Sequence, residues 1–134
     1  MANRTDLPTI EDDSREYWQG AADGRLLIAR CGSCGRVHHY PRLLCPYCWS
    51  EDVTPVPASG QATLYTYSTV YVNDLPPFRD RLPYIAAVVD LAEGPRLMTT
   101  IVGCEPGQLR IGMALRSEPQ DIADGVTATV FRPA

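Results

Sequence analysis

The residues with the clearest capacity for chemistry are four cysteines arranged as two Cys-x-x-Cys pairs. Cys31 and Cys34 form the first pair, Cys45 and Cys48 form the second, and ten residues separate the pairs. Two such turns, brought together by a short hairpin, direct four thiolates at one point in the tetrahedral geometry that suits zinc. The spacing is slightly tighter than in most ribbons, but the pattern is typical of a metal site. A closed four-thiolate site leaves no open coordination position, so the metal is expected to be structural.

Iron in a rubredoxin-like cage and a pair of disulfides are the alternatives to zinc. The same four thiolates would hold iron, whereas disulfides require an oxidising compartment. Residues 1–6 contain no apolar signal segment, so we expect a cytoplasmic chain with reduced cysteines. His38 and His39 lie between the pairs and could replace a ligand. Because four cysteines already complete the site, we expect both histidines on the exposed hairpin of the ribbon.

Size and charge exclude several classes of protein. A length of 134 residues fits one compact domain, or a small domain with an appendage. No run approaches 18 consecutive apolar residues, so no transmembrane helix and no membrane partner are expected. The formal net charge is −4, and four thiolates with one Zn²⁺ would lower it by a further two units. Nucleic-acid-binding proteins usually carry a basic surface instead.

Residues 1–24 are expected to form an arm and a short helix. Residues 1–10 are polar and contain a proline, which is typical of a loosely held terminus. Asp13 and Glu16 match a capping box at the start of the helix, and Gly24 is a suitable stop. Four residues share one face of this helix, and we expect them to anchor it by packing, with a partner surface as the alternative: Tyr17, Trp18, Ala21 and Ala22.

Residues 25–58 are expected to form the zinc ribbon and a linker. Residues 25–30 have the pattern of a strand that leads into the first cysteine pair, and residues 37–44 form the return to the second. Gly35 follows the first pair, where a positive φ is often needed. Residues 51–58 contain two prolines and are expected to be a semi-extended linker.

Residues 59–134 have an all-β pattern and are expected to form an OB-fold domain. The expected strands are at residues 62–72, 84–91, 96–102, 112–116 and 126–131. Alternation with a period of two places four side chains on one face of the first strand: Tyr65, Tyr67, Thr69 and Tyr71. Five strands with one long loop at 73–83 favour a small closed five-stranded barrel. A β-sandwich with an open edge is the alternative.

A catalytic group of residues is not evident. Cys104 is the fifth cysteine, its neighbours supply no cation, and Glu105 would raise the pKa of the thiol. We therefore expect Cys104 to be an inert cysteine in a turn or in the core. The sequence contains no Ser-His-Asp grouping, phosphate-binding loop or zinc-protease helix. The chain is expected to be non-catalytic on its own.

A specific order of motifs runs through nearly the whole chain, from about residue 15 to the C-terminus. The motifs are Tyr17-Trp18, Leu26, Arg30-Cys31, Cys34-Gly35, Tyr40-Pro41-Arg42, Cys45-Pro46, Gly60, Pro83-Tyr84, Val88-Val89-Asp90-Leu91, Glu93-Gly94, Val102-Gly103, Ile111-Gly112-Met113 and Phe131-Arg132-Pro133. This order resembles the family of thiolase-associated, acyl-CoA-binding accessory proteins, in which a zinc ribbon is joined to an OB fold. The paired cysteines alone would be common to many ribbons.

The resemblance implies a non-catalytic accessory subunit of a thiolase or of an aldolase built on the thiolase fold. In that family the partner supplies the catalytic Cys and His, and the accessory chain helps to bind acyl-CoA and stabilises the complex. One branch of the family serves retro-aldol cleavage of steroid side-chain CoA thioesters in lipid metabolism, and others serve thiolysis or acyl transfer. We expect two copies on a thiolase dimer, a heterotetramer. The resemblance also places zinc at the four matching cysteines. An OB-fold binder of single-stranded nucleic acid, which the acidic charge disfavours, and a purely structural scaffold are the alternatives.

The 73–83 loop is the best candidate for contact with acyl-CoA or with the partner, because OB folds usually bind through loops between strands. Arginine forks suit the phosphates of CoA, and aromatic faces suit its adenine. The candidate residues are Tyr71, Phe78, Arg79, Arg81 and Tyr84. In the alternative interpretation, Asp74 and Asp80 pair with the two arginines on a solvated loop.

Overall fold

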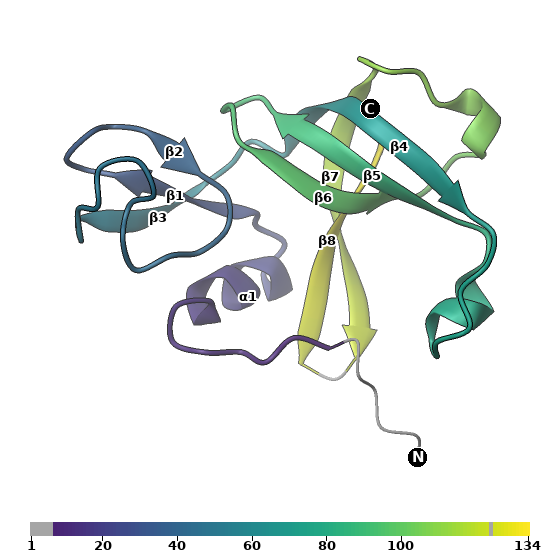
Figure 1. Cartoon of the computed structure of the whole chain (residues 1–134), viewed down its shortest axis with the longest axis horizontal. Helices are drawn as coiled ribbons and strands as arrows, with labels where there is room; N and C mark the ends of the chain where they lie inside the picture. Colours follow the sequence, from purple (N-terminus) through teal and green to yellow (C-terminus); the bar gives the residue numbers. More distant parts are fainter. Residues whose placement is uncertain (1–6, 124) are drawn as a thin grey trace.

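The computed structural model describes residues 7–123 and 125–134, and it is mostly β with one α-helix in this part of the chain. A small sheet, with the turns that hold the paired cysteines, lies at one end of the long axis, and a closed barrel lies at the other (Figure 1). This arrangement confirms the expected ribbon and five-stranded barrel, and the open sandwich is wrong. Residues 1–6, which the sequence assigns to an arm, lie outside the described residues.

The small sheet has three antiparallel strands in the order β2-β1-β3. They are β1 (Leu27–Cys31), β2 (Val37–His38) and β3 (Val53–Pro57). The expected linker at 51–58 is therefore wrong, since β3 pairs with β1 from Val53↔Cys31 to Pro57↔Leu27. Its prolines are compatible with the sheet because β3 is an edge strand, where a missing N–H breaks no ladder hydrogen bond.

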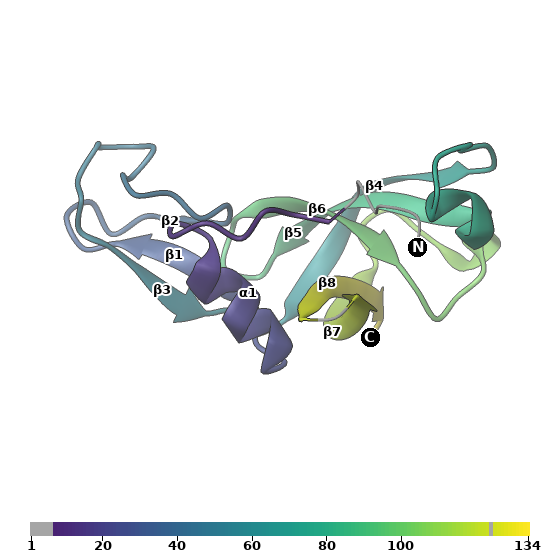
Figure 2. The same cartoon turned by 90° about the horizontal axis from the view of Figure 1, so that it is seen from below.

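Helix α1 (Arg15–Ala22) lies beside the small sheet and packs against the barrel (Figure 2). The expected capping box is wrong: the N-cap is Ser14, whose side chain forms no capping hydrogen bond to the helix and accepts one from the N–H of Glu11 instead. Gly24 follows the helix with φ +79°, as a stop of this kind requires. In residues 7–123 and 125–134, no helix is long and apolar enough to cross a membrane.

The barrel closes in the order β4-β5-β6-β8-β7, and β7 pairs back to β4. Its strands are β4 (Gln61–Val70), β5 (Tyr84–Leu91), β6 (Arg96–Ile101), β7 (Ala114–Ala123) and β8 (Val126–Pro133). β6 meets β8 in parallel through Ile101↔Phe131, and the other neighbours are antiparallel. β7 extends seven residues beyond the expected end at 116, because its hairpin with β8 continues through Pro119↔Thr129.

One core joins the barrel and the ribbon. Every second residue of β5 is buried, as the period of a half-buried strand requires, and Phe131 of β8 is fully buried. Leu26, just before β1, and Ile28, within β1, belong to the same buried cluster. Tyr17 of α1 packs against this cluster, so the expected packing role of this aromatic residue is confirmed.

A β-bulge in β4 changes which tyrosines share a face. Leu64 pairs with Val89 and Thr66 pairs with Val88, so Tyr65 is the extra residue. Such an insertion reverses the alternation of all later residues. Tyr67 therefore turns towards the core, while Tyr65 is 47% exposed. The expectation of a single row of tyrosines along β4 is wrong.

Candidate metal centre and ligand groove

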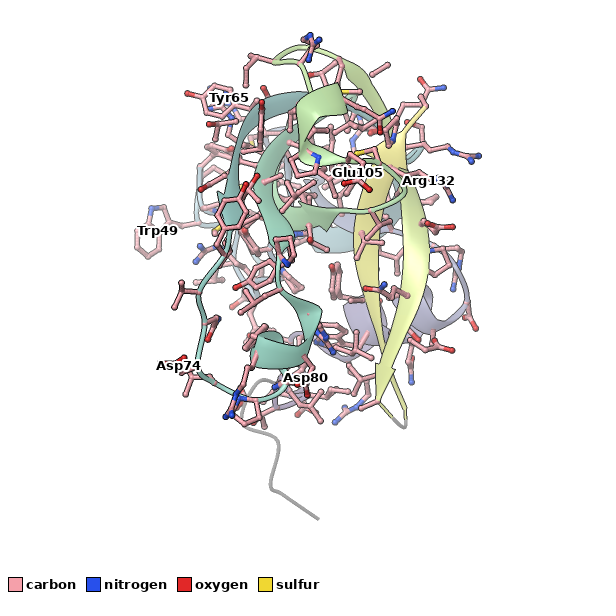
Figure 3. All side chains as sticks on the ribbon, turned by 90° about the vertical axis from the view of Figure 1, so that its right-hand side faces the viewer. Trp49, Tyr65, Asp74, Asp80, Glu105 and Arg132 are labelled. Carbon is pink, nitrogen blue, oxygen red and sulfur yellow. The ribbon has the colours of Figure 1, made fainter. Side chains whose placement is uncertain are left out.

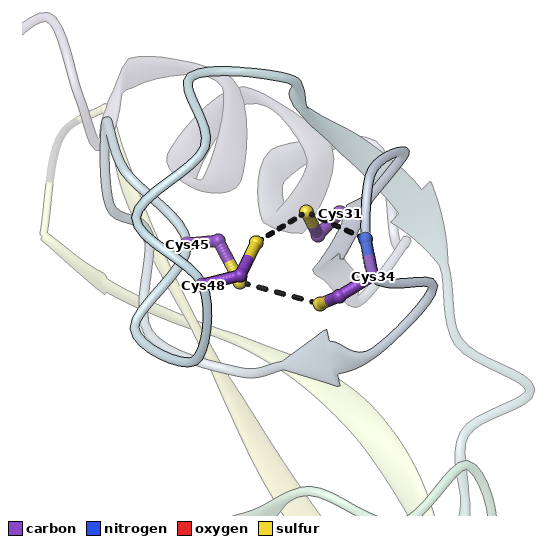
Figure 4. Close-up of side chains that lie close together, drawn as sticks. All are labelled: Cys31, Cys34, Cys45 and Cys48. Carbon is purple, nitrogen blue, oxygen red and sulfur yellow. Dashed lines mark hydrogen bonds between the residues drawn. The ribbon is translucent and has the colours of Figure 1, made fainter.

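The four paired cysteines converge at the tip of the ribbon (Figure 4). Their sulfur atoms all lie within 4.8 Å of one another. Cys31 Sγ is 3.5 Å from Cys48 Sγ, and Cys34 Sγ is 3.7 Å from Cys45 Sγ. Four sulfurs that each lie about 2.3 Å from a tetrahedral zinc would be separated by about 3.8 Å. The donor set and its geometry therefore fit a tetrahedral structural metal.

Disulfides do not fit these distances. A disulfide requires about 2.05 Å between sulfurs, and all five cysteines are free. The backbone N–H of Cys34 approaches Cys31 Sγ at 3.5 Å, and the N–H of Tyr47 approaches Cys45 Sγ at 3.4 Å. Hydrogen bonding from the backbone of Cys34 is the largest of the effects that lower the pKa of Cys31 to about 6. Cys31 is therefore readily held as a thiolate, the form that binds metal. The backbone hydrogen bond of Ser50 favours the thiolate of Cys48, but the neighbouring cysteine sulfurs and burial outweigh it and raise the pKa of Cys48 to about 12.

The two turns are built alike, with a glycine in one and a tryptophan in the other. The N–H of Gly35 donates to the carbonyl of Cys31, and the N–H of Trp49 donates to the carbonyl of Cys45, both at 2.9 Å. Gly35 has φ +76°, as expected, and Trp49 has φ +66°. A left-handed backbone is uncommon for a residue with a side chain. Trp49 was not among the sequence candidates, although it follows Cys45 at the same spacing as Gly35 follows Cys31.

His38 and His39 are not exposed, which corrects the expectation for the hairpin. Each is 7% exposed, and His38 belongs to β2, where it pairs with Ala29 of β1. The His39 ring lies 5.7 Å from the Tyr17 ring and 4.4 Å from the Tyr40 ring. Burial, and secondly the charge of His38, lower the pKa of His39 to about 4. Neither histidine belongs to the metal-binding group in the described part of the chain.

The 73–83 loop lies at the end of the molecule opposite the ribbon (Figure 1). It contains a 3₁₀ turn, η1 (Phe78–Arg81). The side-chain amide of Asn73 donates to the hydroxyl of Tyr84 at 3.1 Å, and Arg79 donates to the backbone carbonyl of Asp74 at 3.1 Å. Within the described residues, neither Asp74 nor Asp80 forms an ion pair with an arginine of the loop. The expected alternative of paired charges is therefore wrong.

A groove of about 700 Å³ brings three of the five candidates together: Phe78, Arg81 and Tyr84. The rings of Phe78 and Tyr84 lie 6.1 Å apart, and the guanidinium of Arg81 lies 6.0 Å from the Phe78 ring. Tyr71 and Arg79 do not line this groove. Its opposite wall comes from Glu105 near β6 and from the extension of β7, including Asp121. The sequence did not predict this extension, so it could not predict this wall of the groove.

Cys104 also lines this groove, at the turn after β6. Burial, followed by the nearby charge of Glu105, raises the pKa of its thiol. A thiol with a raised pKa is a poor nucleophile at neutral pH, so the expectation of an inert cysteine agrees with its surroundings.

Comparison with protein families assigns both parts of the chain. Residues 18–54 match a family described as "ChsH2, rubredoxin-like zinc ribbon domain". Residues 55–118 match one described as "ChsH2, C-terminal OB-fold domain". Both descriptions agree with the architecture and with the metal-binding cysteines.

This chain is similar to two curated proteins and one solved structure of related type. A probable enoyl-CoA hydratase alpha subunit of Thermomonospora curvata is 36% identical over 95% of this chain, which spans only 39% of that protein. A benzoylsuccinyl-CoA thiolase subunit, BbsA, of Thauera aromatica is 33% identical over 77% of this chain and 71% of its own length. A solved structure titled "Ltp2-ChsH2(DUF35) aldolase" is 35% identical, with a TM-score of 0.85, over 95% of this chain and 98% of that chain. The chain therefore belongs to the ChsH2 (DUF35) family, whose members join a rubredoxin-like zinc ribbon to an OB fold.

Proposed function

We propose that this chain is a non-catalytic accessory subunit of a thiolase-fold acyl-CoA enzyme, which it stabilises and helps to bind acyl-CoA. The observation that carries the proposal is similarity over almost the whole chain to the ChsH2(DUF35) part of an aldolase complex. The relative BbsA, named as a thiolase subunit, supports the same class of partner. We place two copies on a thiolase dimer and the complex in the cytoplasm.

The groove beside the 73–83 loop is the acyl-CoA contact in this proposal. Phe78 and Tyr84 offer aromatic faces to the adenine, and Arg81 offers a fork to the phosphates. Glu105 and Asp121 on the opposite wall would repel phosphates. The phosphates therefore belong at the Arg81 rim, where Arg79 is also exposed, and Tyr71 is assigned to the margin of the contact.

The metal in this proposal is zinc, held by Cys31, Cys34, Cys45 and Cys48. A zinc ion with four thiolate ligands has no open position for a substrate, and it would cross-link the two turns of the ribbon. The ribbon is too small to be stable through its own apolar contacts. Its residues therefore serve the complex by holding a rigid shape and not by taking part in the reaction.

The experiment compares the activity and acyl-CoA affinity of the thiolase-fold partner alone, with this chain, and with the Arg79→Ala/Arg81→Ala double variant. We expect an inactive isolated chain, a partner that depends on it, and a double variant that weakens acyl-CoA binding by about 1–3 kcal/mol, the range for charged hydrogen bonds. Arg30→Ala/Arg116→Ala is the matched control, because both arginines are exposed on other strands.

The two parts of the proposal fail separately. A partner that is equally active without this chain contradicts the accessory role. A double variant with wild-type affinity contradicts the acyl-CoA contact at the loop, and the role of the chain then reduces to that of a scaffold.

A further inference from the structure

A second cavity, of about 240 Å³, lies between α1 and the ribbon sheet. Its walls include four carboxylates: Asp12, Asp13, Glu16 and Glu51. Asp12 is already paired with Arg15, at 2.6 Å. The other three form no ion pair among the described residues. The carboxylates around the cavity thus carry more negative charge than their ion-pair partners neutralise.

The basic residues of this cavity do not restore neutrality. His39 lines it, is 7% exposed, and has an Nδ1 with no hydrogen-bond partner in the described part of the chain. Its pKa of about 4 keeps the ring neutral at neutral pH. Among the described residues, Arg42 is then the one cation on the wall, against three unpaired carboxylates. A positively charged group would complement this site.

An apolar groove continues from the acidic cavity. The two share Asp13, Pro41, Arg42 and Leu43, and the groove adds Leu44, Pro46 and Trp49. Leu43 is 71% exposed and Trp49 is 77% exposed. Trp49 occupies a left-handed backbone position that favours glycine. Within the described residues, the indole of Trp49 forms no aromatic or cation–π contact.

We propose that the cavity and the groove form one docking surface for a partner protein, which inserts a lysine or arginine between α1 and the ribbon and lays a neighbouring apolar side chain against Trp49. The identity of that partner, a thiolase-fold enzyme, rests on the proposed function. Tyr65 and Asp74, from β4 and the 73–83 loop, lie on the same side of the molecule as Trp49 (Figure 3). One large partner can therefore contact both ends of this chain.

The size and the geometry of the cavity favour a single basic side chain over other cations. Taken without the adjoining groove, its volume of about 240 Å³ is below the range of about 300–1,000 Å³ that holds a whole small ligand and far above the share of about 30 Å³ of one water. In the described residues, the only group of three or more metal-ligating side chains with atoms within 4.8 Å of one another is the cysteine cluster. The carboxylates are too dispersed to chelate a metal.

The first test uses N-acetyl-arginine methylamide as the probe and the isotopically labelled, metal-loaded full chain. Backbone NMR signals of Glu16, His39 and Glu51 should shift saturably. N-acetyl-citrulline methylamide, which has the same shape without the charge, should bind at least tenfold more weakly. Asp13→Asn/Glu51→Gln should abolish the difference between the two probes. Asp74→Asn, an exposed carboxylate at the other end of the molecule, should preserve it. Equal binding of the two probes, or no binding of either, overturns the proposal.

The second test measures the affinity of the thiolase-fold partner. Trp49→Gly and Asp13→Asn/Glu51→Gln should each weaken the complex by tenfold or more. Glycine suits the backbone at position 49, so this variant removes the side chain without straining the turn. Wild-type affinity in both variants overturns the docking surface and leaves the accessory function intact. If the arginine probe binds selectively but no thiolase-fold enzyme binds this chain, the proposed function is refuted. The acidic cavity is then still supported as the site for a basic side chain.

Discussion

The hydroxyl oxygen of Tyr40 accepts a hydrogen bond of 3.3 Å from the backbone N–H of Met98. Tyr40 lies in the return of the ribbon, and Met98 lies on β6 of the barrel. The bond joins parts of the chain that are 58 residues apart, and it satisfies a backbone donor that points away from β5. It fixes the ribbon against the side of the barrel.

Removing this hydroxyl should loosen the junction. Tyr40→Phe keeps the ring beside His39 but leaves the N–H of Met98 to water. We expect a loss of about 1 kcal/mol of unfolding free energy and faster amide exchange at Met98. Tyr47→Phe is the control, because Tyr47 is an exposed tyrosine of the same ribbon. Unchanged exchange at Met98 in Tyr40→Phe would show that the bond is not maintained in solution.

The metal should hold the ribbon more than the barrel. We expect one zinc per chain by elemental analysis, and Cys45→Ser should lose it and unfold the ribbon turns while much of the barrel remains. The binding free energy of such a metal, on the order of 10 kcal/mol, is also folding free energy. Cys104→Ser is the control, since this cysteine lies outside the cluster. One equivalent of iron, or a folded ribbon without metal, would contradict the assignment.

Acid should destabilise the fold through His39. Burial lowers its pKa from 6.5 to about 4 in the folded chain. The unfolded chain therefore binds this proton at a higher pH, and stability falls as the pH drops from about 6.5 towards 4. His39→Phe keeps a ring beside Tyr17 and cannot titrate. By urea denaturation at pH 7 and pH 4.5, wild type should lose on the order of 2 kcal/mol more than the variant. Equal losses would refute this contribution of His39.

Tight binding to single-stranded nucleic acid is not expected. The net charge is −4, and phosphate contacts dominate such affinity. Fluorescence anisotropy with labelled single-stranded DNA and RNA at physiological salt should show no submicromolar binding. A submicromolar complex with a steep dependence on salt would favour the alternative function over the accessory role.

Local signals predicted much of the fold. The cysteine spacing predicted the thiolate cluster, and the glycines at 24 and 35 predicted two left-handed positions. The apolar residues of 84–91 predicted a strand, and the structure shows this strand with one buried face. Each of these features depends on residues that are near in sequence, so one amino-acid sequence is sufficient to predict them.

The features that the sequence did not reveal depend on distant partners. Val53–Pro57 has the composition of a linker and becomes a strand because β1 offers it an edge. The histidine pair is polar but buried, and the rings of Tyr17 from α1 and Tyr40 from the return of the ribbon lie against the ring of His39. The groove by the 73–83 loop needs a wall from β7, so its composition could not be derived from the loop alone.

The prolines of β3 also determine how the ribbon behaves towards other chains. Pro55 and Pro57 face Ala29 and Leu27 of β1, and the other side of β3 is an open edge in the order β2-β1-β3. A free edge can recruit a strand from another molecule, but a proline has no N–H to donate to it. At these two positions the open edge of β3 presents backbone carbonyl acceptors but no backbone N–H donors. The ribbon can therefore form the exposed tip of a larger assembly without extending its sheet into a neighbouring copy and starting aggregation.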